Sequence, residues 1–418
     1  MEQQAAMSQA VLKPDHVADA VVYDFDMFRD PGLRAGPHER LLELIRDAPK
    51  IFWTPRNGGH WVFLGHDVVA DAARDTDSFS NEAMPHEQLQ AMLARLPEGT
   101  PHVPVPYPLM LDPPRHQQYR QPLLRAFSPK TVMGMQDNIR SLACALIDQI
   151  AGEGRCEFMS AVAEPLPVQI FLKMFGLPLE MMPAYRALVR ENFAQQGNSS
   201  QAEGMLRLMK VTAIMREEVL ARRDQPRDDI ISLLWSLEID GKRTTLEDIE
   251  NYAALLFIAG LDTVMNGIGY AACHLARDQE LQSKLRAQPN LIPQAAEEML
   301  RRYSFVVVPR RVKQDLVFSG VAMKRDDRVQ LHLPAANLDP NAFAEPATYQ
   351  LNRESHAHIT FNAGPHRCLG SHLARVELQI FYEELLARMP PFRLDPAKPP
   401  SYLCSQILGI DRLYLLWN

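Results

Sequence analysis

The chain has 418 residues, of which 46% are hydrophobic and 23% charged, a balance typical of globular proteins in water. Its formal net charge of −7 gives no support for a nucleic-acid partner. The absence of an apolar run near roughly 18 residues and of a basic-then-apolar start argues against a membrane span and a signal peptide. The cysteines, five in number and irregularly spaced, argue against a disulfide framework and lead us to expect a cytoplasmic protein.

The N-terminal part shows an irregular arm followed by signals for strands. Residues 1–35 lack clear periodicity. Residues 51–54 and 60–64 are short aromatic and β-branched runs, separated by the turn-forming stretch Pro55-Arg56-Asn57-Gly58-Gly59. We therefore predict a β-hairpin here, followed by a helix over residues 67–74.

A proline-rich stretch then covers residues 84–108. It is most extreme at Thr100-Pro101-His102-Val103-Pro104-Val105-Pro106-Tyr107-Pro108. Proline lacks a backbone N–H, so such a run cannot form a helix or a central strand. We expect a long irregular loop, which in a compact protein is often functional.

A helical pattern begins after Asp112-Pro113-Pro114, because proline suits the first turn of a helix. His116 and Arg120 lie four residues apart and therefore share one face of this helix. A pair of this kind is usually part of a solvated polar face. A binding role for it depends on evidence from elsewhere in the chain.

Helical periodicity dominates the middle of the chain. It appears over residues 131–150, 165–175, 182–194 and 204–223. The last two segments are joined by a polar stretch, residues 195–201. A helix pair joined in this way is either a moving lid or an ordinary connection between helices, and periodicity alone does not choose between them.

One long apolar helix is predicted over residues 246–277, on the order of 45 Å at about 1.5 Å per residue. Thr245 and Asp248 form a capping pair at its start. One face carries both apolar and polar side chains: Leu255, Ile258, Ala259, Asp262, Thr263 and Asn266. Polar groups inside a buried helix are costly unless they are bonded. They therefore indicate either a function or a local bond, such as a threonine that bonds the carbonyl four residues back and bends the helix.

Two further features precede the C-terminal region. Glu298 and Arg301 are three residues apart and can pair on one helical face. Residues 305–310 read Phe-Val-Val-Val-Pro-Arg and are rich in β-branched side chains. This composition predicts a strand.

Near the C-terminus, the turn-forming loop Phe361-Asn362-Ala363-Gly364-Pro365-His366-Arg367-Cys368-Leu369-Gly370 leads into an amphipathic helix. The buried face of that helix is marked by Leu369, Leu373, Val376 and Ile380. Cys368 is thus placed at or next to a helix N-terminus, where free N–H groups and the helix dipole favour a thiolate. His366 and Arg367 are expected to add positive charge beside it.

A single thiolate without a second cysteine nearby suits one axial bond to a metal. Haem iron is the centre that uses one cysteine thiolate in this way, and the electron density of the sulfur favours cleavage of the O–O bond. The alternative is a buried cysteine that only packs at a helix start, which is the commoner role of a lone cysteine.

The loop resembles the haem-binding loop of the cytochrome P450 monooxygenases, written F-G-x-G-x-H-x-C-x-G. The matching positions are Phe361, Gly364, His366, Cys368 and Gly370. Asn362 stands where the family usually has glycine, and asparagine tolerates a left-handed backbone. The resemblance implies haem b as the cofactor, with Cys368 as its axial thiolate and His366 among the haem-binding residues.

Further motifs match the family in chain order. His116 and Arg120 match an H-x-x-x-R pair that binds a haem propionate. The run Ala259-Gly260-Leu261-Asp262-Thr263 matches the helix that crosses above the haem, where small residues leave room for oxygen and an acid–alcohol pair delivers protons. The resemblance therefore implies that Asp262 and Thr263 are catalytic.

The region between these motifs also follows the family pattern. Glu298, Arg301 and Arg353 match an ion network with a structural role. Alignment outward from this network puts Arg310 at a second propionate position, with Arg311 as the neighbouring alternative. The residues expected in the substrate pocket are Tyr107, Leu255, Ile258, Ala259 and Val306.

The resemblance spans essentially the whole chain and is closest to the camphor-hydroxylating bacterial subfamily. It implies a mainly α fold with small β-sheets, one domain over residues 1–418, with a β-richer part around residues 36–66 and 305–335. The tyrosine that binds camphor in that subfamily is replaced by Pro104, and Tyr107 is a nearby substitute. We therefore expect a terpenoid or norisoprenoid substrate, camphor-like or ionone-like, rather than camphor itself.

The chain shows no flavin or Fe–S motif of its own, so electrons must come from a partner. By resemblance, the partner is a [2Fe–2S] ferredoxin with an NAD(P)H-dependent reductase. A basic docking patch is expected from Arg115, Arg120, Arg367 and Arg375. We further expect a monomer that binds O2 and a small apolar substrate, beneath a lid jointed at residues 195–201.

Two alternatives come from other classes of protein. A peroxide-driven haem enzyme and a haem-based sensor would both keep the thiolate. Neither requires an acid–alcohol pair for proton delivery. Asp262 and Thr263 therefore favour an O2-activating monooxygenase over both.

Overall fold

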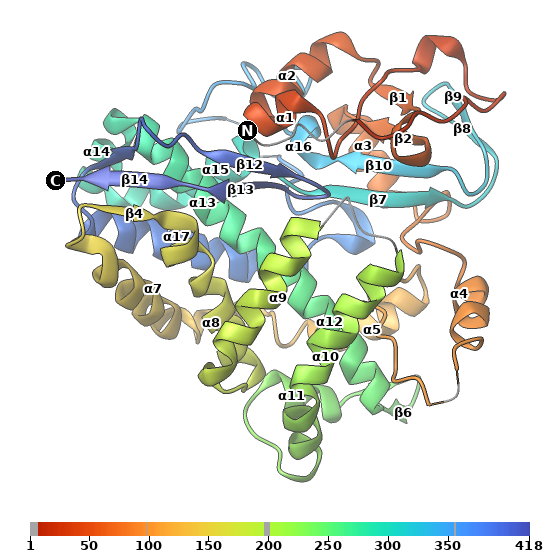
Figure 1. The fold of residues 1–418 in the computed structure, drawn as a ribbon, viewed down its shortest axis with the longest axis horizontal. Helices are drawn as coiled ribbons and strands as arrows, with labels where there is room; N and C mark the ends of the chain where they lie inside the picture. The colour runs from red at the N-terminus through yellow and green to blue at the C-terminus, as the bar shows by residue number, and fades with distance from the viewer. Residues whose placement is uncertain (1–6, 98, 196–200, 355–356) are drawn as a thin grey trace.

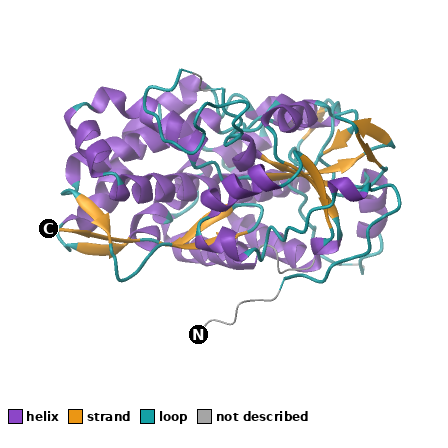
Figure 2. Ribbon diagram, turned by 90° about the horizontal axis from the view of Figure 1, so that it is seen from above, coloured by secondary structure: helices purple, strands orange, loops and turns teal. Residues whose placement is uncertain are grey.

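The computed structural model describes residues 7–97, 99–195, 201–354 and 357–418. Helices make up most of the molecule, and the strands form small sheets toward its edges (Figures 1 and 2). The predicted mainly α class with small β-sheets is confirmed. The predicted joint over residues 195–201 falls almost entirely on residues 196–200, which lie outside the described part of the chain.

The helices and strands have the following bounds. The helices are α1 (Pro31–Ala35), α2 (Pro37–Asp47), α3 (His66–Arg74), α4 (His86–Leu93), α5 (Arg115–Leu123), α6 (Pro129–Met133), α7 (Gln136–Ala151), α8 (Pro165–Phe175), α9 (Met182–Gln195), α10 (Gln201–Asp224), α11 (Ile230–Trp235), α12 (Leu246–Gly260), α13 (Asp262–Arg277), α14 (Gln279–Ala287), α15 (Ile292–Arg302), α16 (Leu333–Ala336) and α17 (Ser371–Arg388). The strands are β1 (Ile51–Thr54), β2 (His60–Phe63), β3 (Phe79–Ser80), β4 (Arg155–Glu157), β5 (Glu238–Ile239), β6 (Lys242–Arg243), β7 (Val307–Val312), β8 (Leu316–Phe318), β9 (Val321–Met323), β10 (Arg328–His332), β11 (Phe392–Leu394), β12 (Ser401–Cys404), β13 (Leu408–Arg412) and β14 (Tyr414–Trp417).

The largest sheet has the strand order β1-β2-β10-β7-β3. The predicted hairpin is present: β1 and β2 pair antiparallel, with Trp53 opposite Trp61. β10 pairs parallel to β2 and antiparallel to β7, so residues near 60 and near 310 lie in one sheet. Buried aromatic and β-branched side chains from these strands pack against the alanine-rich face of α3.

The helical part surrounds one continuous apolar core. α17 packs against α7, α13 and α15, which fixes the last helix of the chain within the helical part. This packing positions the loop that precedes α17, because Gly370 is the N-cap residue of the helix.

The predicted long helix is present as α12 and α13, which run through the middle of the molecule (Figure 1). Thr245 and Asp248 form the predicted capping box at its start, with Asp248 N–H donating to Thr245 Oγ1 at 3.2 Å. By length and composition, the span Leu246–Arg277 could cross a membrane, but 72% of the apolar window is buried inside the protein. It is therefore placed as the core helix of a globular fold.

Three stretches differ from the prediction. The pattern over residues 131–150 resolves into α6 and α7, with a break at Gly134 and Met135. The arm over residues 1–35 ends in the short helix α1, because Asp30 accepts a hydrogen bond from Leu33 N–H at 3.0 Å. Residues 84–108 are not wholly irregular: His86 to Leu93 contain good helix formers and no proline, and they form α4.

Candidate functional site

The loop before α17 folds into a turn that depends on Asn362 and Gly364. Asn362 has a φ of 63° and its side-chain oxygen accepts a hydrogen bond from Ala363 N–H at 2.8 Å. The expected left-handed asparagine is thus confirmed. Gly364 has a φ of 69°, and a Cβ there would lie 2.7 Å from Ala73 O. The loop therefore lies directly against the end of α3.

The loop presents Cys368 to an internal space. Its backbone N–H donates to Phe361 O at 2.8 Å, which closes the loop on itself. The Cys368 side chain is accessible, yet desolvation by the surrounding protein is the largest influence on its pKa. The Cys368 thiol is thus reachable and at the same time surrounded by protein.

In the protein without a bound metal, burial opposes the local effects that favour a thiolate at Cys368. Burial raises the pKa of Cys368, and the lesser opposing effects of the Gly370 backbone N–H and of Arg120 do not offset it. Burial also lowers the pKa of His366 to about 2, so this histidine is neutral and adds no positive charge. A metal cation bound to the Cys368 sulfur would favour the thiolate again, since coordination deprotonates a thiol.

Beside Cys368, buried nitrogen atoms converge without hydrogen-bond partners. Both ring nitrogens of His116 and the Nε2 atom of His366 lack a partner within the described ranges, and the two rings are 4.1 Å apart between centroids. Arg310 is buried and its Nη2 atom likewise has no partner there. The charges of Arg310 and Arg120 both contribute to lowering the pKa of His366, which places these four side chains close together.

Arg310 and Arg311 point to different surroundings. Arg310 donates one hydrogen bond, from Nη1 to Pro309 O at 2.8 Å. Arg311 pairs instead with Asp326, with its Nη1 atom 2.9 Å from Asp326 Oδ1, at the far side of the strand. Of the two, Arg310 is therefore the one available to an anion held beside His366.

A second open region lies at the junction between α12 and α13. Ala259 and Gly260 are exposed although the helix around them is buried, and no atom lies within 4 Å of a Cβ placed on Gly260. Thr263 Oγ1 donates to Ala259 O at 2.8 Å, the local bond considered from the sequence. Asp262 is buried at the start of α13.

Asn266, the remaining polar residue of this face, has a structural explanation. Its Nδ2 atom donates to Asp262 O at 2.7 Å, and its Oδ1 atom accepts from Ile410 N–H at 2.9 Å. Asn266 therefore ties α13 to β13 and holds the backbone of Asp262.

Four of the residues predicted for the substrate pocket lie in α12 or just before β7, and the fifth, Tyr107, lies elsewhere. Leu255, Ile258 and Ala259 lie along α12, and Val306 forms a bridge with Ile407 just before β7. Tyr107 instead packs on Tyr119, with ring centroids 5.3 Å apart. Its predicted contact with substrate stays a prediction.

Asn251 was not predicted from the sequence. Its side chain accepts a hydrogen bond from the proline-rich stretch that follows α4. Asn251 precedes Leu255 by four residues, so it extends the same face of α12. An amide on that face of a buried apolar helix was the available signal. Ile407 was also missed, since only the fold brings it beside Val306.

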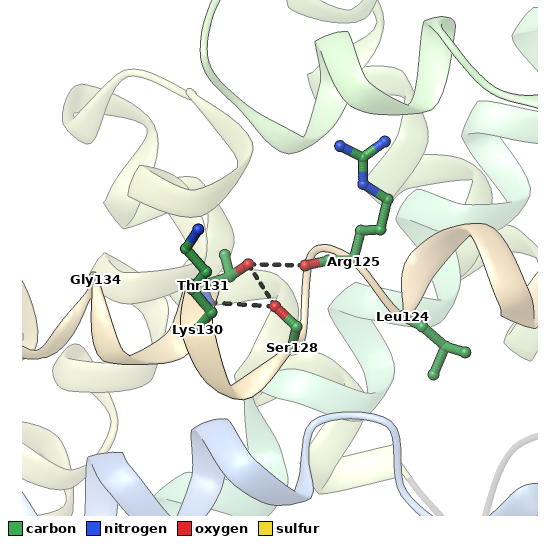
Figure 3. A pocket seen from close by; sticks show the side chains of 6 residues that line it. All are labelled: Leu124, Arg125, Ser128, Lys130, Thr131 and Gly134. Carbon is green, nitrogen blue, oxygen red and sulfur yellow. Dashed lines mark hydrogen bonds between the residues drawn. The ribbon is translucent and has the colours of Figure 1, made fainter.

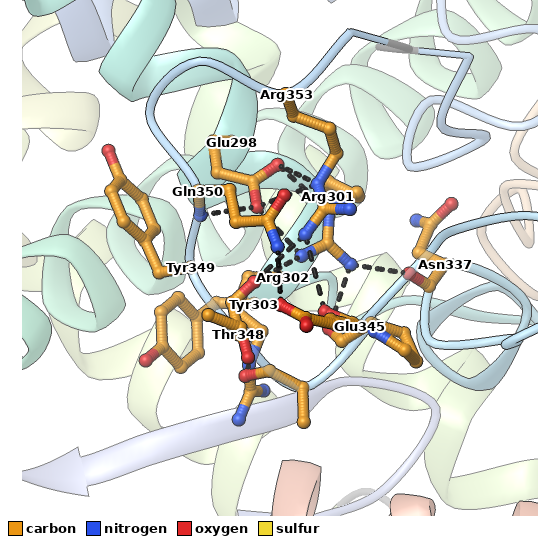
Figure 4. Close-up of polar contacts among 12 residues, drawn as sticks. Glu298, Arg301, Arg302, Tyr303, Asn337, Glu345, Thr348, Tyr349, Gln350 and Arg353 are labelled. Carbon is orange, nitrogen blue, oxygen red and sulfur yellow. Dashed lines mark hydrogen bonds and ion pairs between the residues drawn. The ribbon is translucent and has the colours of Figure 1, made fainter.

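The predicted ion network is present and buried. Glu298 accepts from Arg301 at 2.8 Å on both of its oxygens and from Arg353 at 3.0 and 3.1 Å (Figure 4). Both arginines also donate to backbone carbonyls of residues 337–348. The network therefore fixes α15 to the stretch that leads to the Cys368 loop.

The predicted basic patch is only partly available. Arg375 pairs with Glu297, and its Nη2 atom lies 3.0 Å from Glu297 Oε2. Arg115 lies over the ring of Tyr107 and donates to His86 Nε2 at 2.8 Å. Arg120 donates to Arg367 O, so within the predicted patch only Arg367 is fully exposed beside Cys368.

A surface groove of about 570 Å³ lies between α5 and α6, apart from the residues described above. It is lined by Leu124, Arg125, Ser128, Lys130, Thr131 and Gly134 (Figure 3). Ser128 accepts from Thr131 N–H and caps α6, while Arg125 and Lys130 extend from the ribbon. α6 packs against α17, so the groove lies beside that helix.

These observations fit a haem beside Cys368. The enclosed sulfur of Cys368 suits an axial bond to iron. The unpartnered nitrogens of His116, His366 and Arg310 suit the two carboxylates at the edge of the group. The missing side chain at Gly260 leaves room on the other face.

Comparisons with known proteins agree with this geometry. The family model described as "Cytochrome P450" matches residues 168–405. The "Probable cytochrome P450 127A1" of Sinorhizobium fredii is 34% identical over 413 residues, 97% of this chain and 96% of that protein. The "Linalool 8-monooxygenase" of Pseudomonas putida is 29% identical over 86% of this chain and 90% of its own. The solved structure of "Cytochrome P450 CYP101C1" superposes with a TM-score of 0.86 at 31% identity, over 97% of this chain and 100% of that one.

Proposed function

The chain belongs to the cytochrome P450 family, and we propose that it hydroxylates a small apolar terpenoid or norisoprenoid with O2 and electrons from a ferredoxin. Membership makes it a haem-thiolate oxidoreductase of the monooxygenase class, with haem b held by a cysteine thiolate. The similarity to CYP101C1 places it near the camphor-type bacterial subfamily.

The proposed haem ligand is Cys368, the only cysteine in the loop that faces the enclosed space. His116, Arg120, Arg310 and His366 are proposed to hold the carboxylates of the group, supported by their unpartnered or converging nitrogens. When bound, haem supplies the site of O2 binding and the redox change that oxygen activation requires. The protein contributes the orientation of the group and a dry surrounding.

Asp262 and Thr263 are proposed to handle protons at the open junction of α12 and α13. The Thr263 hydroxyl donates to Ala259 O, so its oxygen remains an acceptor toward the space left by Gly260. Asp262 is the residue before Thr263, and Asn266 fixes the backbone of Asp262 by donating a hydrogen bond to its carbonyl oxygen. An acid and a hydroxyl held at a helix break can pass a proton without rearrangement of the fold. This arrangement is the observation that carries the proposal of O2 activation over peroxide use or sensing.

The substrate is proposed to lie against Leu255, Ile258, Ala259 and Val306. These side chains are aliphatic, so they favour an apolar molecule over a charged one. The relative that oxidises linalool supports a terpenoid, and the replacement of the camphor-binding tyrosine by Pro104 argues against camphor as the best fit.

A titration of the ferric haem protein with a panel of ligands tests the substrate class. We expect linalool, camphor and ionones to shift the Soret band by displacing water from the iron, with linalool or an ionone binding at least about tenfold more tightly than camphor. Ligand affinity follows apolar contact, and about 1.4 kcal/mol corresponds to tenfold. A response confined to long-chain fatty acids or steroids would contradict the terpenoid assignment.

A [2Fe–2S] ferredoxin with its reductase is proposed as the source of electrons. Arg367 is exposed just before α17, and the groove residues Arg125 and Lys130 lie at α6, which packs against that helix. These side chains offer positive charge to an acidic ferredoxin. We expect Arg125→Glu to slow reduction roughly tenfold at low ionic strength. Stopped-flow reduction measures this, with the exposed Arg393→Glu on β11 as control. A rate that ignores both Arg125→Glu and salt would exclude this surface.

We also propose that residues 1–418 form one domain and act as a monomer in the cytoplasm. The core supports the first point, since one apolar cluster includes residues from Phe25 to Trp417 and α17 packs against α6, α7, α13, α14 and α15 within it. The bacterial relatives and the cysteines without disulfides within the described ranges support the second.

A further inference from the structure

The proline-rich stretch over residues 102–108 is fastened to α12 by one side chain. Asn251 Oδ1 accepts a hydrogen bond from Val105 N–H at 2.7 Å and lies 3.0 Å from His102 Nε2. Asn251 is buried, with 6% of its surface exposed. A single amide oxygen on α12 thus holds both a backbone and a side-chain group of the neighbouring stretch.

This contact matters because the stretch has few backbone donors. Proline occupies positions 101, 104, 106 and 108, and none of these carries an N–H. The Tyr107 N–H is used within the stretch, donating to Val105 O at 2.7 Å. The Val105 N–H is the donor that the described structure sends to α12. Residues 103–108 are nevertheless buried, so their position depends on packing and on Asn251.

The neighbouring residue on α12 fastens a second element. Glu250 is buried and its Oε1 atom accepts from Arg216 Nη1 on α10 at 2.8 Å. His102 also acts on Glu250, since its charge lowers the pKa of that carboxyl against the larger effect of burial. Two consecutive residues of α12 therefore hold α10 on one side and the proline-rich stretch on the other.

The same face of α12 leads from this point to the proposed pocket. Leu255 follows Asn251 by four residues, and Ala259 follows Leu255 by four more, so the three residues form one row along the helix. A shift of residues 103–105 relative to Asn251 would change the wall that a ligand meets one turn above Leu255. Asn251 is thus placed to determine which ligand shapes the pocket accepts, without contacting the ligand.

We propose that Asn251 is a positioning residue that sets ligand selectivity by fixing residues 102–105 against α12. This inference rests on the proposed function, because it assigns a determinant of selectivity to the proposed pocket. Glu250 and Arg216 hold the opposite element in place. Asn251 therefore determines how far the proline-rich wall stands from the row that leads to the haem.

Hydrogen–deuterium exchange on the haem-loaded protein tests the anchor directly. A peptide over residues 103–108 reports on two amides only, those of Val105 and Tyr107, because Val103 carries the free amine of the peptide and the other positions are proline. We expect Asn251→Leu to speed exchange in this peptide about tenfold, since a buried hydrogen bond is lost. Asn251→Asp keeps the acceptor and should leave exchange near the wild-type rate. Should Asn251→Leu not fold, Asn251→Ala removes the same acceptor without adding bulk.

Selectivity is measured with imidazole and phenylimidazole, a small and a bulky ligand of haem iron that need no knowledge of the substrate. We expect the ratio of their dissociation constants to change at least about fivefold in Asn251→Leu and to stay unchanged in Asn251→Asp. The control is Tyr252→Phe, which removes the adjacent buried hydrogen bond from Tyr252 Oη to Tyr119 O at 2.8 Å.

Faster exchange with an unchanged ratio would overturn the role in selectivity. A changed ratio with unchanged exchange, or the same change in Tyr252→Phe, would overturn the role as an anchor. Neither readout depends on terpenoid turnover, so a wrong substrate class would leave this test intact.

Discussion

Replacement of Cys368 by alanine is expected to abolish monooxygenase activity and the shifted Soret band of the reduced CO complex that gives the cytochrome P450 family its name. The proposed axial sulfur comes from this residue alone, and no nearby thiol is placed to substitute for it: Cys404 and Cys273 are buried elsewhere, at β12 and in α13. The reduced CO spectrum measures the ligand, and haem content measures retention of the group.

The matched control is Cys156→Ala. Cys156 is a free, half-buried cysteine in β4, away from the loop. It should keep the normal spectrum and activity, because the pKa of its thiol is raised to about 12 by burial and no role depends on its thiolate. A Cys368→Ala protein with the normal CO spectrum would exclude Cys368 as the ligand and, with it, the arrangement proposed for the site.

The sequence sufficed to locate the Cys368 loop because its geometry is local. Spacing within ten residues places the cysteine before a helix, and Asn362 adopts the left-handed turn expected of asparagine. The capping box at Thr245 and the β1–β2 hairpin are local in the same sense. Such features follow from the conformational preferences of a few neighbouring residues.

The effect of burial on the pKa values of Cys368 and His366 could not be predicted from the sequence. A helix N-terminus lowers the pKa of a thiol in water, but Cys368 is enclosed by elements far away in the chain, and desolvation raises its pKa instead. His366 is neutral for the same reason. The ion pair that engages Arg375 likewise depends on Glu297, which lies 78 residues earlier in the chain.

Long-range contacts also explain the residues that sequence reasoning missed. The Asn251 side chain accepts a hydrogen bond from the Val105 N–H, which lies 146 residues earlier in the chain. Ile407 meets Val306 only through an isolated bridge between distant segments. A polar residue on the apolar face of a long helix indicates that a partner exists, but the fold identifies the partner.

Replacement of Thr263 by alanine is expected to separate electron use from product formation. Electron delivery should continue, since Thr263 is not among the residues proposed to hold the haem or to dock the ferredoxin. Product per electron should fall at least about tenfold, a modest part of what a positioned proton donor contributes, and hydrogen peroxide should rise in proportion. Measurement of NAD(P)H, product and peroxide in the same reaction gives this ratio.

The hydrogen bond from Thr263 to Ala259 O allows a second explanation, in which the hydroxyl only holds the bend between α12 and α13. Thr263→Ser keeps both the hydroxyl and this bond, so it should restore most of the coupling. Thr212→Ala is the matched control, because Thr212 is a buried threonine that bonds Leu208 O in α10 in the same way, at 3.3 Å. If the bend alone mattered, Thr263→Ala would alter ligand affinity and thermal stability while product per electron stayed unchanged. Loss of coupling with unchanged affinity assigns the effect to the hydroxyl oxygen that faces the space beside Gly260.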